Sequence, residues 1–582
     1  MSKRMLHTVV SRNPVRRRAL LLVVVLVMVV LLSLLAAGYT LMVRAHLDGV
    51  TTEIRQFKIR MAADSGMQMA INTLRYTRGD VDSWHNNPLL YRAYLVQGKE
   101  GEEAEATYQK AIDTEIKTFD PTLDEAFRFS CFTPDFDDPT KVYYGFVDES
   151  SRMDINSIKE DQLRRLLTET VPVNTDFPVD VDVLVDSFLD WREPGDDPRP
   201  SGAKSAYYAT MIPPYTSKGA KFSTVEELLL VRGFTSWVVF GEDYNQNGLL
   251  DPNENDGSES FPPDDANGVL WRGIAPFFTV WSQEANISGD NRPRIFLNME
   301  DLDKLQEKLE TEIDGDIVSY IMAVRSAGIR FNSVMNLLPA PPPDEEEPTS
   351  QPDNGGEPPN DEPPPATQPA GEDPTSQPFD QKGEDSAKRF ADQDGSESGS
   401  ENPPPAGGPG GNPQQNPTSQ PVFSNLTDEE PPGTYEDLPI LLDRLTVSPS
   451  PIMSGRINVT TAPREVLGMI DELTPDNVEA IVAARQGLDS ATKSSPAWLV
   501  TQGVISEYKF RRILEKITTK SSVFRIETVG FADNIGIVER YMAVIQMRGP
   551  VAQVLYYRNL NPLGMAYTPH GDEVRGPQEQ SK

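Results

Sequence analysis

The feature that most constrains this chain is an apolar segment close to its N-terminus. Residues 19–43 are almost entirely apolar, and a helix of this length rises about 37 Å, enough to cross the hydrocarbon core of a bilayer. Arg16, Arg17 and Arg18 precede the segment, whereas only Arg44 follows it closely. The positive-inside rule therefore predicts a single-pass membrane protein with a cytoplasmic N-terminus and its bulk outside. A cleaved secretory signal is the alternative, although its apolar region would be shorter and would end at a small-residue cleavage site.

The helical pattern continues beyond Arg44, because apolar residues recur mostly at steps of three and four. These residues are Leu47, Val50, Ile54, Phe57, Met61, Met67, Ala70, Ile71 and Leu74. Two interpretations are open. One long rod would leave its first half free to pack against similar rods in a fibre, whereas a plain anchor would be followed by an ordinary core helix.

Charge and composition exclude several classes of function. A formal net charge of −34 argues against nucleic-acid binding, which requires Lys and Arg to displace counterions from phosphates, and it suits calcium better. Cys131 is the single cysteine, so no intrachain disulfide can form. No Ser-His-Asp, Cys-His or clustered metal-ligand pattern appears, and we therefore assign no catalytic residues and predict that the protein is not an enzyme.

Three stretches repeat one plan, in which a short apolar run carrying Asn leads into a helix and then into a second helix that ends in Arg. The runs begin at Met153, Ile295 and Ile457, and the second helices end at Arg192, Arg325 and Arg485. Such hairpins resemble DNA-binding units, but the third copy places Asp471 and Glu472 where a Gly-rich phosphate-binding turn would be needed. We therefore interpret the hairpins as structural.

The rest of the chain divides into a small sheet and a biased insert. Alternating and β-branched residues at 523–526 and 535–547 predict strands. Residues 339–438 are rich in Pro, Gly and acidic residues and repeat Pro-Thr-Ser-Gln-Pro, a composition that predicts disorder. The fold class predicted is α+β.

One segment fits a chemical motif without a gap. Asp243-Tyr-Asn-Gln-Asn-Gly-Leu-Leu-Asp-Pro-Asn-Glu254 has the twelve-residue calcium-loop pattern, with Gly248 at the sharp turn. Ca²⁺ prefers six to eight hard oxygens, which this spacing supplies from side chains and from one backbone carbonyl. The predicted ligands are Asp243, Asn245, Asn247, the carbonyl of Leu249, Asp251 and Glu254. An Asn- and Asp-rich surface turn is the alternative.

Several segments resemble the general secretion pathway protein K family, the large minor pseudopilins of type II secretion systems. They are the basic and then apolar start at 16–35, Val147-Asp-Glu-Ser-Ser-Arg-Met-Asp-Ile-Asn156, Leu189-Asp-Trp, Asp196-Asp-Pro-Arg-Pro-Ser-Gly-Ala203, Ser223-Thr-Val-Glu-Glu-Leu-Leu-Leu-Val-Arg-Gly233 and Ile457-Asn-Val-Thr-Thr-Ala-Pro463. The order of these segments along the chain also resembles the family.

The resemblance implies a long pilin-like N-terminal helix with a transmembrane first half, a small β-sheet, an inserted and mainly α-helical domain of helical hairpins, and calcium sites. It also implies a subunit at the tip of a periplasmic pseudopilus, which starts assembly with other minor pseudopilins and contacts secreted proteins from the inner membrane. One departure concerns processing, because Arg17 or Arg18 stands where family members carry Gly before the apolar helix.

These observations predict nine segments. They are a cytoplasmic basic leader (1–18), a transmembrane helix (19–43), its periplasmic continuation (44–80), the start of a pilin-like part (81–150), an inserted helical domain with the calcium loop (151–290), a second hairpin (291–338), the disordered insert (339–438), a hairpin with C-terminal strands (439–560) and a flexible tail (561–582). The alternative function is that of a membrane-anchored, calcium-dependent extracytoplasmic binding protein unrelated to secretion.

Overall fold

The computed structural model describes most of the chain outside the predicted disordered insert. The residues described are 14–98, 125–136, 141–172, 179–259, 264, 266–340, 430–533 and 536–564. Residues 341–429 of the predicted disordered insert, and most of the predicted leader and tail, therefore lie outside the described residues. Residues 339–340 and 430–438 of the predicted insert are described, and Leu438 is buried at the start of a helix.

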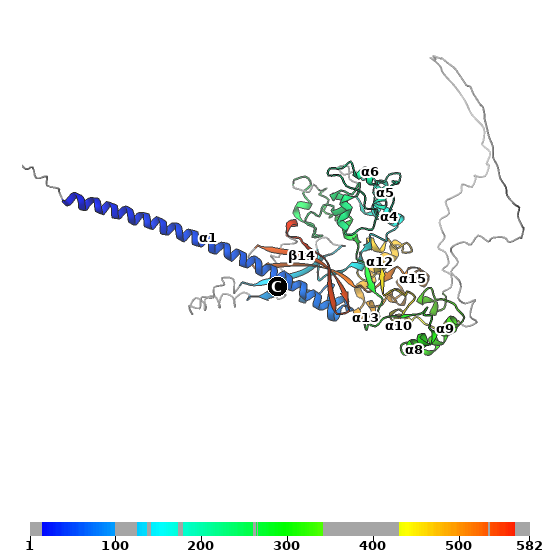
Figure 1. The fold of residues 1–582 in the computed structure, drawn as a ribbon. Coiled ribbons are helices and arrows are strands. Elements are labelled where there is room, and N and C mark those ends of the chain that lie inside the picture. Colours follow the sequence, from blue (N-terminus) through cyan, green and yellow to red (C-terminus); the bar gives the residue numbers. More distant parts are fainter. Residues whose placement is uncertain are drawn as a thin grey trace, which may run out of the picture. The chain divides into compact units, whose positions relative to one another are not determined.

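The N-terminal helix α1 (Pro14–Thr77) is one unbroken helix of 64 residues (Figure 1). Its apolar side chains from Leu21 to Val43 are exposed, whereas Ile59, Ala63 and Leu74 are buried. By length and composition, α1 is long and apolar enough to cross a membrane. The single continuous helix agrees with the predicted rod, and its second half is at the same time a core helix.

The second half of α1 packs on a seven-stranded antiparallel sheet with the order β1-β2-β13-β14-β15, in which β3 also pairs with β2 and β4 with β13. The strands are β1 (Tyr94–Gln97), β2 (Phe127–Pro134), β3 (Val142–Tyr144), β4 (Val147–Asp148), β13 (Val523–Ala532), β14 (Val538–Arg548) and β15 (Val551–Asn559). The predicted C-terminal strands are therefore present, with β13 longer than its β-branched run suggested.

Two glycines allow α1 to approach the sheet closely. A Cβ atom on Gly530 of β13 would lie 2.1 Å from the carbonyl oxygen of Ile59, and one on Gly66 of α1 would lie 2.6 Å from the ring of Phe129. The hydroxyl of Thr528 donates to the carbonyl oxygen of Ala63 at 3.1 Å. Only glycine leaves room for such a crossing.

Between β4 and β13 the chain forms an inserted part with its own core. Its helices are α4 (Glu160–Thr170), α5 (Val181–Arg192), α6 (Ser205–Tyr208), α7 (Ser236–Phe240), α8 (Leu302–Leu309), α9 (Gly315–Ser326), α10 (Leu438–Arg444), α11 (Arg464–Leu467), α12 (Pro475–Gly487), α13 (Ser490–Lys493), α14 (Trp498–Thr501) and α15 (Glu507–Ile513), with short 3₁₀ turns that include η2 (Glu149–Ser151), η3 (Val225–Leu230), η4 (Pro252–Glu254) and η6 (Val334–Leu337). The predicted α+β class is thereby confirmed.

Each of the three sequence repeats is closed by a pair of short parallel strands. The pairs are β5 (Met153–Asp154) with β6 (Phe278–Thr279), β8 (Ile295–Phe296) with β9 (Leu445–Thr446), and β11 (Ile457–Asn458) with β12 (Ile517–Thr518). In each repeat, the backbone amide of the residue after the opening strand donates to the carbonyl oxygen of the Thr in the closing strand. The three pairs are Ile155 with Thr279, Leu297 with Thr446, and Val459 with Thr518. The structure thus confirms the repeat and adds closing strands that the sequence analysis had not identified.

Side chains at equivalent positions hold the first two repeats together in the same way. The side-chain amide of Asn156 exchanges two hydrogen bonds with the backbone of Phe222, and that of Asn298 does the same with Phe331. In the third repeat Thr460 stands at this position. Asn458, which the sequence pattern aligned with the other two, instead donates to the buried carboxylate of Asp148.

Candidate functional site

The predicted calcium loop follows α7 and folds around Asp243. This side chain is 5% exposed, and its two carboxylate oxygens accept hydrogen bonds from the amides of Asn247 and Gly248, each at 2.9 Å. Gly248 has a φ of +70°, a left-handed conformation that favours glycine. The tight turn expected from the motif is therefore present.

The two asparagines of the motif point toward Asp251. The side-chain nitrogens of Asn245 and Asn247 donate to Oδ2 of Asp251 at 2.8 and 2.9 Å. Oδ1 of Asn247 accepts from the amide of Leu249, the position expected to offer a carbonyl oxygen. Four of the predicted ligand residues are thus joined in one network.

Glu254 closes the loop from its far end. It is 2% exposed, and its carboxylate accepts from the amides of Tyr244 and Asp251 at 2.9 and 3.1 Å. The segment η4 carries Glu254 back toward the start of the loop. All six predicted ligand positions therefore lie in one compact turn.

The buried carboxylates of the loop favour a nearby cation. Burial raises the pKa of Asp243 to about 6, and burial together with the charge of Asp243 raises the pKa of Glu254 to about 7. A divalent cation would relieve this repulsion. Across the part of the chain that the structure describes, no three His, Cys, Asp or Glu side chains form a metal-binding group, so an ion here would depend on asparagine and carbonyl oxygens as well.

An arginine that sequence reasoning missed fastens the loop to the sheet. Arg540 of β14 is 1% exposed, and its Nη1 and Nη2 donate to the carbonyl oxygens of Asn245 and Gln246 at 2.6 and 2.7 Å. Its Nε pairs with Glu527 of β13. Because this arginine lies almost 300 residues from the loop in sequence, no local pattern could have identified it.

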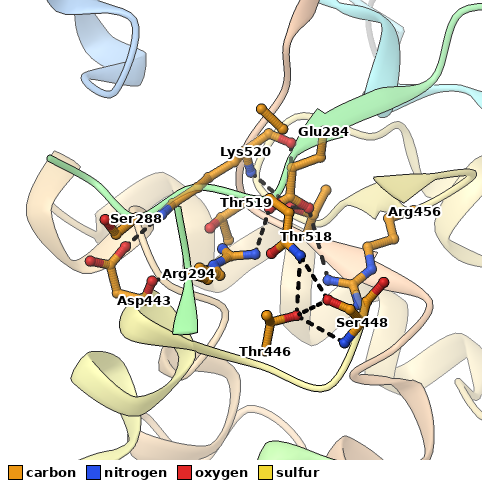
Figure 2. Close-up of polar contacts among 12 residues, drawn as sticks. Glu284, Ser288, Arg294, Asp443, Thr446, Ser448, Arg456, Thr518, Thr519 and Lys520 are labelled. Atoms are coloured by element: carbon orange, nitrogen blue, oxygen red, sulfur yellow. Dashed lines mark hydrogen bonds and ion pairs between the residues drawn. The ribbon is translucent and has the colours of Figure 1, made fainter. Parts of the chain in front are cut away.

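A second polar cluster lies where the second and third repeats meet (Figure 2). Glu284 on β7 (Gln283–Ala285) is buried, and its carboxylate accepts from Arg294 at 3.1 Å and from the hydroxyl of Thr518 at 2.8 Å. Nearby, Lys520 donates to Asp443 at 2.6 Å. The cluster borders a cavity of about 820 Å³, and its charges are paired internally, so we interpret it as a connection between repeats.

Comparison with known proteins identifies one family. Residues 147–239 match the family model for the first domain of protein K of the type II secretion system. This range begins at β4 and ends within α7, just before the calcium loop. Over these residues, the match confirms the resemblance that the sequence motifs indicated. No curated protein matches the chain.

Among solved structures, the chain is similar to a protein in the crystal structure of the GspK-GspI-GspJ complex of the enterotoxigenic Escherichia coli type II secretion system. The sequence identity is 7% and the TM-score 0.32. The alignment covers 87% of this chain and 98% of the other.

Proposed function

We propose that this chain is a minor pseudopilin of a type II secretion system. The match of residues 147–239 to the protein K family supports a minor pseudopilin role and is the observation that carries the proposal. Members of this family are components of a secretion apparatus, and we accordingly propose a structural role without catalysis. The architecture is compatible with it, because α1 offers an exposed apolar half and a half that packs on the sheet.

We further propose that the exposed half of α1 spans the inner membrane once, with the N-terminus in the cytoplasm and the sheet and inserted part in the periplasm. The apolar composition of Leu21 to Val43 and the basic residues before it support this orientation. In this position the subunit would sit at the tip of the pseudopilus, start its assembly with other minor pseudopilins and contact secreted proteins, as the family resemblance implies.

Calcium is proposed as a structural ion of the loop at 243–254. Asp243, Asn245, Asn247, Asp251 and Glu254 would hold Ca²⁺ with the carbonyl of Leu249, and the ion would supply the positive charge that the buried carboxylates lack. Full-length protein in detergent should melt at a higher temperature in millimolar Ca²⁺ than in EDTA, and Glu254→Gln should lose most of this difference. Equal melting temperatures with no calcium bound would remove the ion from the proposal.

The assembly role is tested by co-purification. Full-length protein would be co-expressed with each candidate minor pseudopilin encoded beside it, with and without calcium, and isolated through a tag on either partner. We expect a stable complex with at least one of them. If the protein remains alone with every candidate, the secretion role fails and a membrane-anchored binding protein becomes the better explanation.

A further inference from the structure

Arginines from separate parts of the chain line a small cavity between the sheet and the inserted part. The cavity has a volume of about 140 Å³ and lies beside Asp243 and Gln246 of the predicted calcium loop. The arginines that line it are Arg152, Arg272, Arg525 and Arg558. Three carboxylates also line the cavity, those of Glu226, Asp243 and Glu527, so its lining carries four arginines against three acidic side chains.

Two of these guanidinium groups have hydrogen-bond donors to spare. Arg525 donates from Nε to Glu149 at 2.7 Å, but its Nη1 and Nη2 make no hydrogen bond within the described residues. The guanidinium of Arg152 makes neither a hydrogen bond nor an ion pair to any part of the chain that the structure describes. Both side chains are half-buried, so these donor groups are accessible to an external acceptor.

The acidic residues around the cavity are already engaged, and Asp243 among them accepts hydrogen bonds from two backbone amides of its own loop. Glu149 bonds to Arg525 and to the hydroxyl of Thr279, Glu527 pairs with Arg540, and Glu226 pairs with Arg558 at 3.3 Å. Burial, and next the neighbouring charge of Arg525, lower the pKa of Arg152 to about 10, so its guanidinium remains a cation at neutral pH. The charges of Glu149, Asp148 and Glu527 act in the opposite direction, although none of these described carboxylates forms an ion pair with Arg152.

We propose that this cavity binds a small oxyanion between Arg152 and Arg525. A planar guanidinium presents parallel N–H donors that match the two oxygens of a carboxylate or phosphate. The volume admits one such group and little more. An acidic side chain or a free chain end of a partner protein can supply the oxygens, and so can inorganic phosphate. The inference goes beyond the proposed secretion role and does not depend on it.

The test measures melting temperature and binding heat of full-length protein in detergent at constant ionic strength. The probes are sodium acetate, inorganic phosphate, and a short peptide with a free C-terminal carboxylate beside its amidated form. We expect at least one oxyanion to raise the melting temperature and Arg152→Gln to weaken its binding by about tenfold or more. Arg164→Gln, which removes a half-buried arginine on α4 that pairs with Asp182 away from the cavity lining, is the control and should respond to the anions like the wild type.

The melting temperature without added anion distinguishes a binding role from a structural one. If Arg152 serves binding, Arg152→Gln should melt at or above the wild-type temperature, because the substitution removes a half-buried charge and its repulsion from Arg525. If that variant does not fold, Arg152→Lys, which keeps the charge but not the planar donor pair, should fold and bind more weakly.

A larger effect of the free-acid peptide than of the amidated peptide would assign the oxyanion to a protein, whereas a larger effect of phosphate would assign it to a free ion. Either result supports the cavity as an oxyanion site. No stabilisation by any probe, or equal stabilisation of Arg152→Gln, would overturn it. So would a marked loss of anion-free stability in both Arg152 variants.

Discussion

Gly248 connects the shape of the predicted calcium loop to the sheet. It combines a φ of +70° with close packing, since a Cβ atom here would lie 2.5 Å from the ring carbons of Pro134 at the end of β2. Gly257, a few residues further on, has a φ of +75° but nothing within 4 Å of an added Cβ atom. Comparing substitutions at the two glycines therefore distinguishes the cost of the left-handed backbone from the cost of steric contact.

We predict that Gly257→Ala lowers the free energy of unfolding by about 1 kcal/mol, from the left-handed backbone alone. Gly248→Ala should cost about 2–4 kcal/mol, because Pro134 must also move. Denaturant melts of the full-length protein in detergent would measure both. Equal losses of unfolding free energy would show that the contact with Pro134 adds nothing to the cost of the Gly248 substitution.

Asp148 is a buried carboxylate at the junction of β4 with the third repeat. Its oxygens accept from Thr461 at 2.6 Å and from Asn458 at 3.0 Å, yet burial raises its pKa to about 6. A raised carboxyl pKa means that the folded protein holds this proton more tightly than the unfolded chain does. The stabilisation that comes from this bound proton is therefore complete below about pH 4, the pKa of the group in the unfolded chain. It is lost as the pH rises through about 6.

We accordingly predict that Asp148→Asn, which stays neutral at every pH, gains stability relative to the wild type between pH 4 and pH 7. The melting temperatures of the two proteins should diverge over that window and run in parallel above it. Curves that remain parallel from pH 4 upward would contradict the raised pKa.

At the scale of elements, Gly530 allows α1 and β13 to approach each other closely. Gly530→Ala would place a methyl group against the backbone of Ile59, and we expect it to lower the free energy of unfolding by about 2–4 kcal/mol. The control is Gly487→Ala at the end of α12, where an added Cβ atom meets nothing within 4 Å. If both variants melt alike, the helix can shift along the sheet at little cost.

The elements differed in how far the sequence could predict them. The helix α1 and the long strands β13 and β14 have extended apolar patterns, and these were identified. The closing strands of the repeats have two residues each, too few for a period to appear. These strands form because the helices between them bring distant backbone segments together. Such pairing depends on the tertiary fold and leaves no local sequence pattern.

At the scale of the whole molecule, the exposed first half of α1 is the feature that favours an apolar environment over water. Substituting Arg for Val27, Leu31 and Leu34 together should raise the free energy of membrane insertion by about 8–10 kcal/mol. We expect this variant to leave the membrane fraction during an alkaline wash. A double control, Phe57→Arg with Tyr76→Arg, changes exposed residues of the second half and should stay membrane-bound; release of both variants would point to general unfolding.

The predicted site shows the same division at this scale. The loop from Asp243 to Glu254 is local in sequence, so its spacing could be read directly. The folding of the sheet and the insert brings Arg540, Arg525 and Arg152 close to the loop. No spacing along the chain predicts this. Sequence therefore predicted the loop and missed what surrounds it.

The placement of β13 beyond the insert has a consequence for biosynthesis. Strand β2 has Phe129 and Cys131 in the core, yet its partner Val523–Ala532 leaves the ribosome only after the whole insert has been made. Until then the aromatic face of the emerging chain stays uncovered and prone to misassociation. Polypeptides truncated before Val523 therefore cannot complete this sheet, and the face of β2 that β13 would pair with stays uncovered in them.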